Sequence, residues 1–139
     1  MELKDVQDYL PEVVLEMVEL IGFVDTEKLI NAFGGTTFRF TDGQYYFPKL
    51  VEAVGRESAV ALRKYFNIEQ VYIPRCEVAL RLLRNYRFKA DFDWLTESNG
   101  KSGRLAMLEL CPKYGVSDRA GWDILRKMSS ATTNQSALF

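Results

Sequence analysis

Histidine is missing from the sequence, and only two of its 139 residues, Cys76 and Cys111, are cysteines. Without imidazole, the chain cannot form the usual histidine-containing zinc sites or a Ser-His-Asp triad. A disulfide is not expected in the reducing cytosol, so both thiols are expected to be small buried apolar groups. The sequence therefore predicts no metal site, no cofactor and no catalytic residue.

Long apolar runs and phosphate-binding loops are also absent. No run approaches the roughly 20 apolar residues that span a bilayer, and the first ten residues lack the basic and apolar regions of a signal peptide. Residues 99–102 match only the end of the GxxxxGK[ST] loop. Asp91, Asp93 and Glu97 are too loosely spaced to predict a metal or acid-base site. We expect a cytoplasmic protein that is not an enzyme and does not bind a membrane.

Charge is distributed unevenly along the chain, although the net charge is only −1. Residues 1–74 contain 7 Lys or Arg against 12 Asp or Glu, and residues 75–139 contain 11 against 7. An acidic part followed by a basic part suits an assembly module joined to a module that meets phosphates. Chance scatter of solvated charges is the alternative interpretation.

The acidic part contains an internal duplication with a period of 33 residues. The shift aligns residues 18–22 with 51–55, Leu29 with Leu62, Phe33 with Phe66, Phe38 with Val71 and Phe40 with Ile73. Each copy predicts a helix, a glycine, a second helix and a strand; in the first copy a helix runs from Pro11 to Gly22 and another over 26–33. We expect the strands 36–40 and 70–73 to pair about a pseudo-two-fold axis as a ribbon, which helix packing or a second subunit must support.

A helix is predicted to follow Pro74, over 76–88, with its apolar pattern continuing to Trp94 and Leu95 as one long or bent helix. Its inward face is assigned to Val78, Leu80, Leu82 and Leu83. Three arginines recur every three residues on the outer side, where they could follow a nucleic-acid backbone or pair with the acidic part. These are Arg81, Arg84 and Arg87.

Residues 113–128 are predicted to complete a helix-turn-helix whose first helix covers 104–110. Gly115 closes that first helix, Val116 fills the turn, and Ser117 caps the second helix. The buried side of the first helix is assigned to Leu105, Met107, Leu108 and Leu110. In the second helix, Trp122, Leu125 and Met128 are predicted to be buried, and Arg119, Asp123, Arg126 and Lys127 to be exposed.

Several motifs together make the chain resemble the Mor transcription activator family of Mu-like bacteriophages and prophages. They are FGG at 33–35, VYIPR at 71–75, RNYR at 84–87 followed by ADFD at 90–93, and KYGVSDR at 113–119 with Trp122 and residues 124–125. The resemblance implies a mostly helical homodimer in a bacterial host cell that binds a dyad-symmetric, double-stranded promoter element and recruits host RNA polymerase. It also implies that Gln70, Tyr72 and Arg75 lie on a linking strand near DNA, and that Ser117, Arg119, Trp122, Asp123 and Arg126 belong to the recognition helix. Lys127 is a further candidate for phosphate or guanine contact.

The predicted fold is mainly α. A helical assembly and dimerisation region with the duplication and a short two-stranded ribbon occupies residues 1–74, a helical domain with the helix-turn-helix occupies 75–128, and a disordered tail occupies 129–139. Three features depart from the family pattern: Asn67-Ile68 in place of a Gly pair, Pro112 inside a helix, and Ala120-Gly121 where long polar side chains are expected. The last two of these features, together with the acidic residues 1–74 and the isoelectric point of about 5.6, support an alternative function. In it, the chain is a Mor-derived module that binds a host protein and inhibits a defence or transcription complex.

Overall fold

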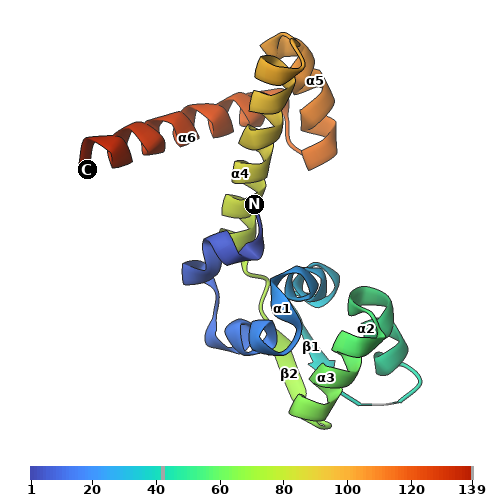
Figure 1. Ribbon diagram of the computed structural model, residues 1–139. Coiled ribbons are helices and arrows are strands. Elements are labelled where there is room, and N and C mark those ends of the chain that lie inside the picture. The colour runs from blue at the N-terminus through green and yellow to red at the C-terminus, as the bar shows by residue number, and fades with distance from the viewer. Residues whose placement is uncertain (42, 139) are drawn as a thin grey trace. The chain divides into compact units, whose positions relative to one another are not determined.

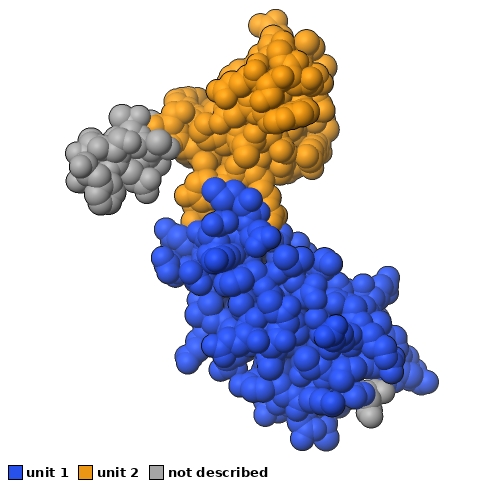
Figure 2. All heavy atoms as spheres, in the orientation of Figure 1, with its two compact units in different colours: residues 1–80 blue, residues 81–139 orange. Residues whose placement is uncertain are grey.

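The computed structural model describes the backbone of residues 1–41 and 43–138 and the side chains of residues 1–41 and 43–129. The fold is mainly helical with one two-stranded antiparallel sheet (Figure 1), which confirms the predicted class. The chain divides into two compact units, residues 1–80 and 81–139 (Figure 2). In the described part of the chain, no helix is long and apolar enough to cross a membrane.

The first unit is built from short helices around the sheet. Its elements are the 3-10 helix η1 (Leu3–Tyr9), α1 (Glu12–Phe33), β1 (Thr36–Arg39), α2 (Tyr46–Val54), α3 (Arg56–Phe66) and β2 (Gln70–Ile73). Sequence reasoning missed η1, which buries Leu3 and Val6. The predicted helix over 26–33 was too short, because helical conformation resumes directly after a break at Gly22 within α1.

The two copies of the repeat, residues 17–40 and 50–73, share unusual backbone conformations. Gly22 has φ 84° and ψ 169°, and its equivalent, Gly55, has φ 88° and ψ 162°. A positive φ costs glycine little because it has no Cβ. The Gly35 position is occupied in the second copy by Ile68, and both residues have positive φ. The second copy therefore keeps the turn without its glycine.

The pairing of β1 with β2 follows the symmetry of the repeat. Phe38 lies opposite Val71, and these two residues are also equivalent in the two copies. The Gly35 N–H donates to the Ile73 carbonyl at 2.6 Å, and in the equivalent contact the Ile68 N–H donates to the Phe40 carbonyl at 3.0 Å. The ribbon predicted from the sequence is thus formed within one chain, about a pseudo-two-fold axis.

Equivalent positions of the two copies are also buried together in one core. Met17 and its equivalent Leu50 are fully buried, as are Leu29 and Leu62, and Phe40 and Ile73. The core cluster draws residues from α1, β1, α2, α3 and β2, so each copy completes the apolar surface of the other. Burial of this apolar surface, rather than the two short strands, stabilises the first unit.

The second unit contains the helix-turn-helix. Helix α4 (Glu77–Asp93) starts in the first unit and ends in the second, and a single π-helical turn, η2 (Trp94–Ser98), follows it. Helices α5 (Gly103–Tyr114) and α6 (Asp118–Leu138) complete the unit. The predicted disordered tail falls almost wholly on residues 130–139, whose side chains lie outside the described residues, and it stays a prediction.

Several predicted core positions were wrong. Leu105 and Leu108 are 55% and 73% exposed, and Val78 is also exposed. The prediction was correct for Leu83 of α4 and for Met107 and Leu110 of α5, which are buried. Buried positions that were not predicted for these helices are Ala79, Phe88 and Ala106. Leu-rich helices offer more than one apolar stripe, so periodicity alone did not select the buried one. Cys111 is buried as predicted, whereas Cys76 is only half-buried; both are free thiols.

Candidate nucleic-acid interface

The turn between α5 and α6 has the predicted geometry. Gly115 ends α5 in the left-handed conformation, with φ 66° and ψ 34°. The Val116 N–H donates to the Cys111 carbonyl at 3.0 Å, which closes the last helical turn. Val116 packs against the core of the second unit. These contacts fix the orientation of α6 relative to α5, as in a helix-turn-helix.

Pro112 lies inside α5, which continues past it to Tyr114. Proline deprives the carbonyl four residues earlier, that of Leu108, of its helical hydrogen bond. Leu108 lies on the exposed side of α5, where water can replace the missing donor. Pro112 is therefore accommodated in the last turn of α5 and does not end the helix.

Helix α6 starts with the predicted cap. The Ala120 N–H donates to Ser117 Oγ at 3.1 Å, and Asp118 places a negative charge in the first turn. A side-chain acceptor and an acidic residue both stabilise a helix N-terminus. The N-terminus of α6 is thus anchored to the turn.

Gly121 is a packing residue, which corrects the expectation of a long polar side chain there. A Cβ at this position would lie 2.8 Å from Met107 Sδ, 3.1 Å from Cys111 Sγ and 3.1 Å from Phe88 Cζ. Helix α6 can approach α4 and α5 this closely only because residue 121 has no side chain. Gly121 is thus explained by helix packing, and it does not indicate that the chain has lost the ability to contact bases.

Trp122 was predicted as a core anchor, and this prediction was wrong. Its side chain is 40% exposed, and its ring packs edge-on against Phe92 at a centroid distance of 5.8 Å. Ile124 is the buried residue of this part of α6, while Leu125 and Met128 pack against the core as partly buried residues. Gly121 lies at the centre of the buried face, so Trp122, one residue later, is turned about 100° towards solvent.

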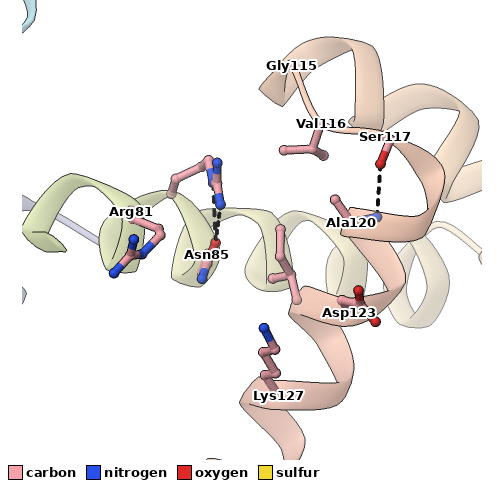
Figure 3. A pocket seen from close by; sticks show the side chains of 10 residues that line it. Arg81, Asn85, Gly115, Val116, Ser117, Ala120, Asp123 and Lys127 are labelled. Atoms are coloured by element: carbon pink, nitrogen blue, oxygen red, sulfur yellow. Dashed lines mark hydrogen bonds between the residues drawn. The ribbon is translucent and has the colours of Figure 1, made fainter. Parts of the chain in front are cut away.

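A basic pocket of about 520 Å³ lies between α4 and the start of α6 (Figure 3). Arg81 and Arg84 reach it from α4, and Lys127 reaches it from α6, one turn beyond Asp123. The turn contributes Gly115, Val116 and Ser117. Residues of α4 and α6, which are far apart in the sequence, therefore line one cavity.

Hydrogen bonds orient the charges of this pocket. Arg84 donates from Nε and Nη2 to Asn85 Oδ1, at 3.3 and 3.1 Å. Asp123, the one acidic residue among those that line the pocket, is bound by Arg126. Its negative charge is thereby offset, and the pocket stays positive. The positive charges of such a pocket suit an anionic group such as a phosphate.

Asp91 fastens α4 to the end of α5. Its Oδ2 accepts hydrogen bonds from Tyr114 Oη at 2.5 Å and from Lys113 Nζ at 2.9 Å. Burial alone would raise the pKa of Asp91, but these two donors and the Lys113 charge together lower it. Burial and the bond to Asp91 raise the pKa of Tyr114 to about 12. Asp91 thus has a structural role in the helix-turn-helix.

The remaining predicted residues lie on the ribbon of the first unit or directly after it. Gln70 and Tyr72 are exposed on β2, opposite Arg39 and Thr37 of β1. Arg75 follows the strand, and its Nη1 lies 3.6 Å from Glu77 Oε1. Arg39, which sequence reasoning missed, is exposed beside Gln70 and is the repeat equivalent of Tyr72. The alternation of the first strand was a signal that could have found it.

The predicted site residues therefore form two groups, one in each unit. Gln70, Tyr72 and Arg75 belong to the first unit. Ser117, Asp123 and Lys127 line the basic pocket of the second unit. Arg119, Trp122 and Arg126 are exposed on α6 next to it.

Most of the chain matches the profile of a known protein family. The profile is that of the Mor transcription activator family, and it matches residues 39–138. No curated protein and no solved structure matches the chain. The matched residues include the second copy of the repeat, all of α4 and the helix-turn-helix, and they exclude nearly all of the first copy.

Proposed function

The chain belongs to the Mor transcription activator family, and we propose that it is a phage or prophage regulator that binds promoter DNA through its helix-turn-helix and engages host RNA polymerase. The family is one of transcription activators, which makes this chain a transcription regulator.

The basic pocket is the observation that carries the proposal. Arg81, Arg84 and Lys127 bring three positive charges to one cavity beside the first turns of α6. A regulator of this class needs phosphate contacts next to the recognition helix, because they fix its register on the duplex. A phosphate bound in this pocket would support a position of α6 in the major groove.

The exposed side of α6 would then face the bases. Arg119 and Arg126 have the side chains that most often contact guanine, and Trp122 adds partly exposed apolar surface. On the ribbon, Gln70, Tyr72 and Arg75 supply further polar groups for the backbone or a neighbouring groove. Arg39 joins this group by its position on the exposed face.

The alternative function, inhibition of a host protein complex, has less support from the residues first cited for it. Gly121 has a packing role, and Pro112 is accommodated in the last turn of α5. A homodimer on a dyad-symmetric element remains a prediction of the resemblance. The pairing of the two copies in the first unit suggests a monomer instead.

The test is a fluorescence anisotropy titration of the full chain with promoter fragments from the genome that encodes it, over a salt series. Arg81→Gln combined with Arg84→Gln should weaken binding at least tenfold and reduce the slope of log K against log salt by about 2, since each phosphate contact contributes about 0.9. Arg56→Gln combined with Lys64→Gln, an equal change of charge at two exposed positions of α3, is the control.

Binding without sequence preference or salt dependence would overturn the proposal. In that case, a host protein that stays bound to the chain after nuclease treatment of a lysate would favour the inhibitor.

A further inference from the structure

The first unit holds a complete two-fold arrangement within one chain. Its core combines Leu29, Phe38 and Phe40 of the first copy with Leu62, Phe66 and Ile73 of the second. Since residues of both copies share this core, each copy serves as the packing partner of the other. In a symmetric oligomer, that role belongs to a second subunit.

Two contacts join a residue to its own repeat equivalent. Phe38 pairs with Val71 across the ribbon, and Ser58 Oγ donates to Asp25 Oδ2 at 2.6 Å. Both pairs are 33 residues apart in sequence. Equivalent residues meet only near the axis that relates them, so these pairs mark the axis at the strands and at the starts of two equivalent helices.

The two copies lead into different segments of the chain. The first strand is followed by the short connection to α2, whereas the second is followed by α4 and the helix-turn-helix. The family match covers residues 39–138, which hold one copy and one helix-turn-helix, and nearly all of the first copy lies before the matched residues. The chain therefore has two copies of the repeat and one helix-turn-helix, which is called the reading module below.

We propose that the first copy occupies the place of a second subunit, so that the chain is a monomer with a single reading module and contacts one DNA half-site. The DNA part of this inference rests on the proposed function, while the monomeric state does not. Dimeric helix-turn-helix regulators cover two half-sites about one helical turn apart. This chain should cover only one of them.

Cross-linking across the ribbon tests whether the copies pair within one chain or between two. Thr37 faces Tyr72, and since Phe40 is hydrogen-bonded to Glu69, alternation along the ladder makes Thr37 and Tyr72 a non-hydrogen-bonded pair. Their Cα atoms should be about 4.5 Å apart, within the range that a disulfide spans. The variant is Thr37→Cys with Tyr72→Cys, in a chain that also carries Cys76→Ser and Cys111→Ala.

Oxidation of this variant should give a disulfide-linked monomer on a non-reducing gel, and the matched variant without Tyr72→Cys should give none. A covalent dimer that forms through residues 37 and 72 would overturn the inference, because it would place the two strands in different chains. Circular dichroism checks that the variant is folded.

Sedimentation velocity of the unaltered chain gives an answer that depends on no substitution. A mass near 16.0 kDa that is constant from 1 to 100 μM is expected, and a mass twice as large would overturn the inference. Hydroxyl-radical footprinting on the promoter fragment should show one protected patch, and two patches a helical turn apart would also overturn it. If the chain binds no promoter fragment, the proposed function is refuted. The monomeric state is then tested by the mass and the cross-linking alone.

Discussion

Ile68 occupies in the second copy the position that Gly35 occupies in the first, and the two residues have φ 73° and 86°. Their amide groups make equivalent hydrogen bonds, to the carbonyls of Phe40 and Ile73 respectively. A β-branched residue in this region of φ is strained by about 1–3 kcal/mol. The symmetry of the ribbon is therefore maintained at a local energetic cost.

Ile68→Gly should raise the free energy of unfolding by about 1 kcal/mol, because the relief of strain exceeds the entropy that glycine adds to the unfolded chain. Little apolar burial is lost, since Ile68 is 68% exposed. Urea unfolding followed by circular dichroism measures the change. Ile68→Ala, which keeps a Cβ, should give a smaller gain; a loss of stability with glycine would contradict the assignment of strain.

Thr26 should be replaceable by valine with a gain in stability of about 1 kcal/mol. Among the described residues, its buried hydroxyl has no hydrogen-bond partner, and an unpaired buried polar group costs about 1–3 kcal/mol. Its repeat equivalent, Ala59, is buried and apolar. Thr37→Val, at an exposed position of β1, is the control, and its effect should stay within about 0.5 kcal/mol. A loss of stability in Thr26→Val would show that the hydroxyl is satisfied.

Gly121→Val should destabilise the second unit by about 2 kcal/mol or more, because the side chain would overlap Met107, Cys111 and Phe88. Both tryptophans, Trp94 and Trp122, lie in this unit, so fluorescence follows its unfolding. Ala120→Val, one residue earlier and partly exposed, should cost only about 0.5 kcal/mol of helix propensity. Equal effects of the two changes would refute the packing role of Gly121.

Asp91→Asn should lower the stability of the second unit at neutral pH by less than about 1 kcal/mol, since the carboxylate is partly exposed. The folded state lowers the pKa of Asp91 below its ordinary value of 3.8, so its contribution is present above that value and is lost as the pH falls through the folded-state pKa. The difference between variant and wild type should shrink as the pH falls below 3.8 and vanish below the folded-state pKa. Urea unfolding at several pH values measures it, with Glu97→Gln as the control; a difference that grows in acid would contradict the assignment.

Arg39→Gln should weaken promoter binding several-fold and reduce the salt slope by about 1, if the exposed face of the ribbon contacts phosphate. Anisotropy titration measures both quantities, with Arg56→Gln as the matched single change of charge. Unchanged binding would exclude this face of the ribbon from the interface.

Helix ends and turns could be predicted from the sequence better than the buried faces of the helices. Gly115, Val116 and Ser117 were assigned correctly because each role follows from local chemistry, a left-handed turn, an apolar plug and a side-chain acceptor. The ribbon and its symmetry followed from the repeat. These features depend on neighbours in sequence or on one fixed shift, so they are visible without coordinates.

Buried residues were predicted wrongly where several helices pack around one core. Trp122 is large and apolar, yet Gly121 and Ile124 take the buried side of α6, since the close approach to Phe88 and Met107 selects the residue without a side chain. The basic pocket could not be predicted from the sequence, because Arg84 and Lys127 come from two helices, α4 and α6, that are separated in the chain by α5. Arg39 was missed because its strand was considered only for its apolar residues.

The pairing of the two copies within one chain changes how the protein responds to dilution. Separate subunits dissociate when their concentration falls below the dissociation constant, whereas two halves joined by a short linker keep an effective concentration in the millimolar range. The first unit should thus form completely even at a few molecules per cell, and its folding rate should not depend on the amount of protein made.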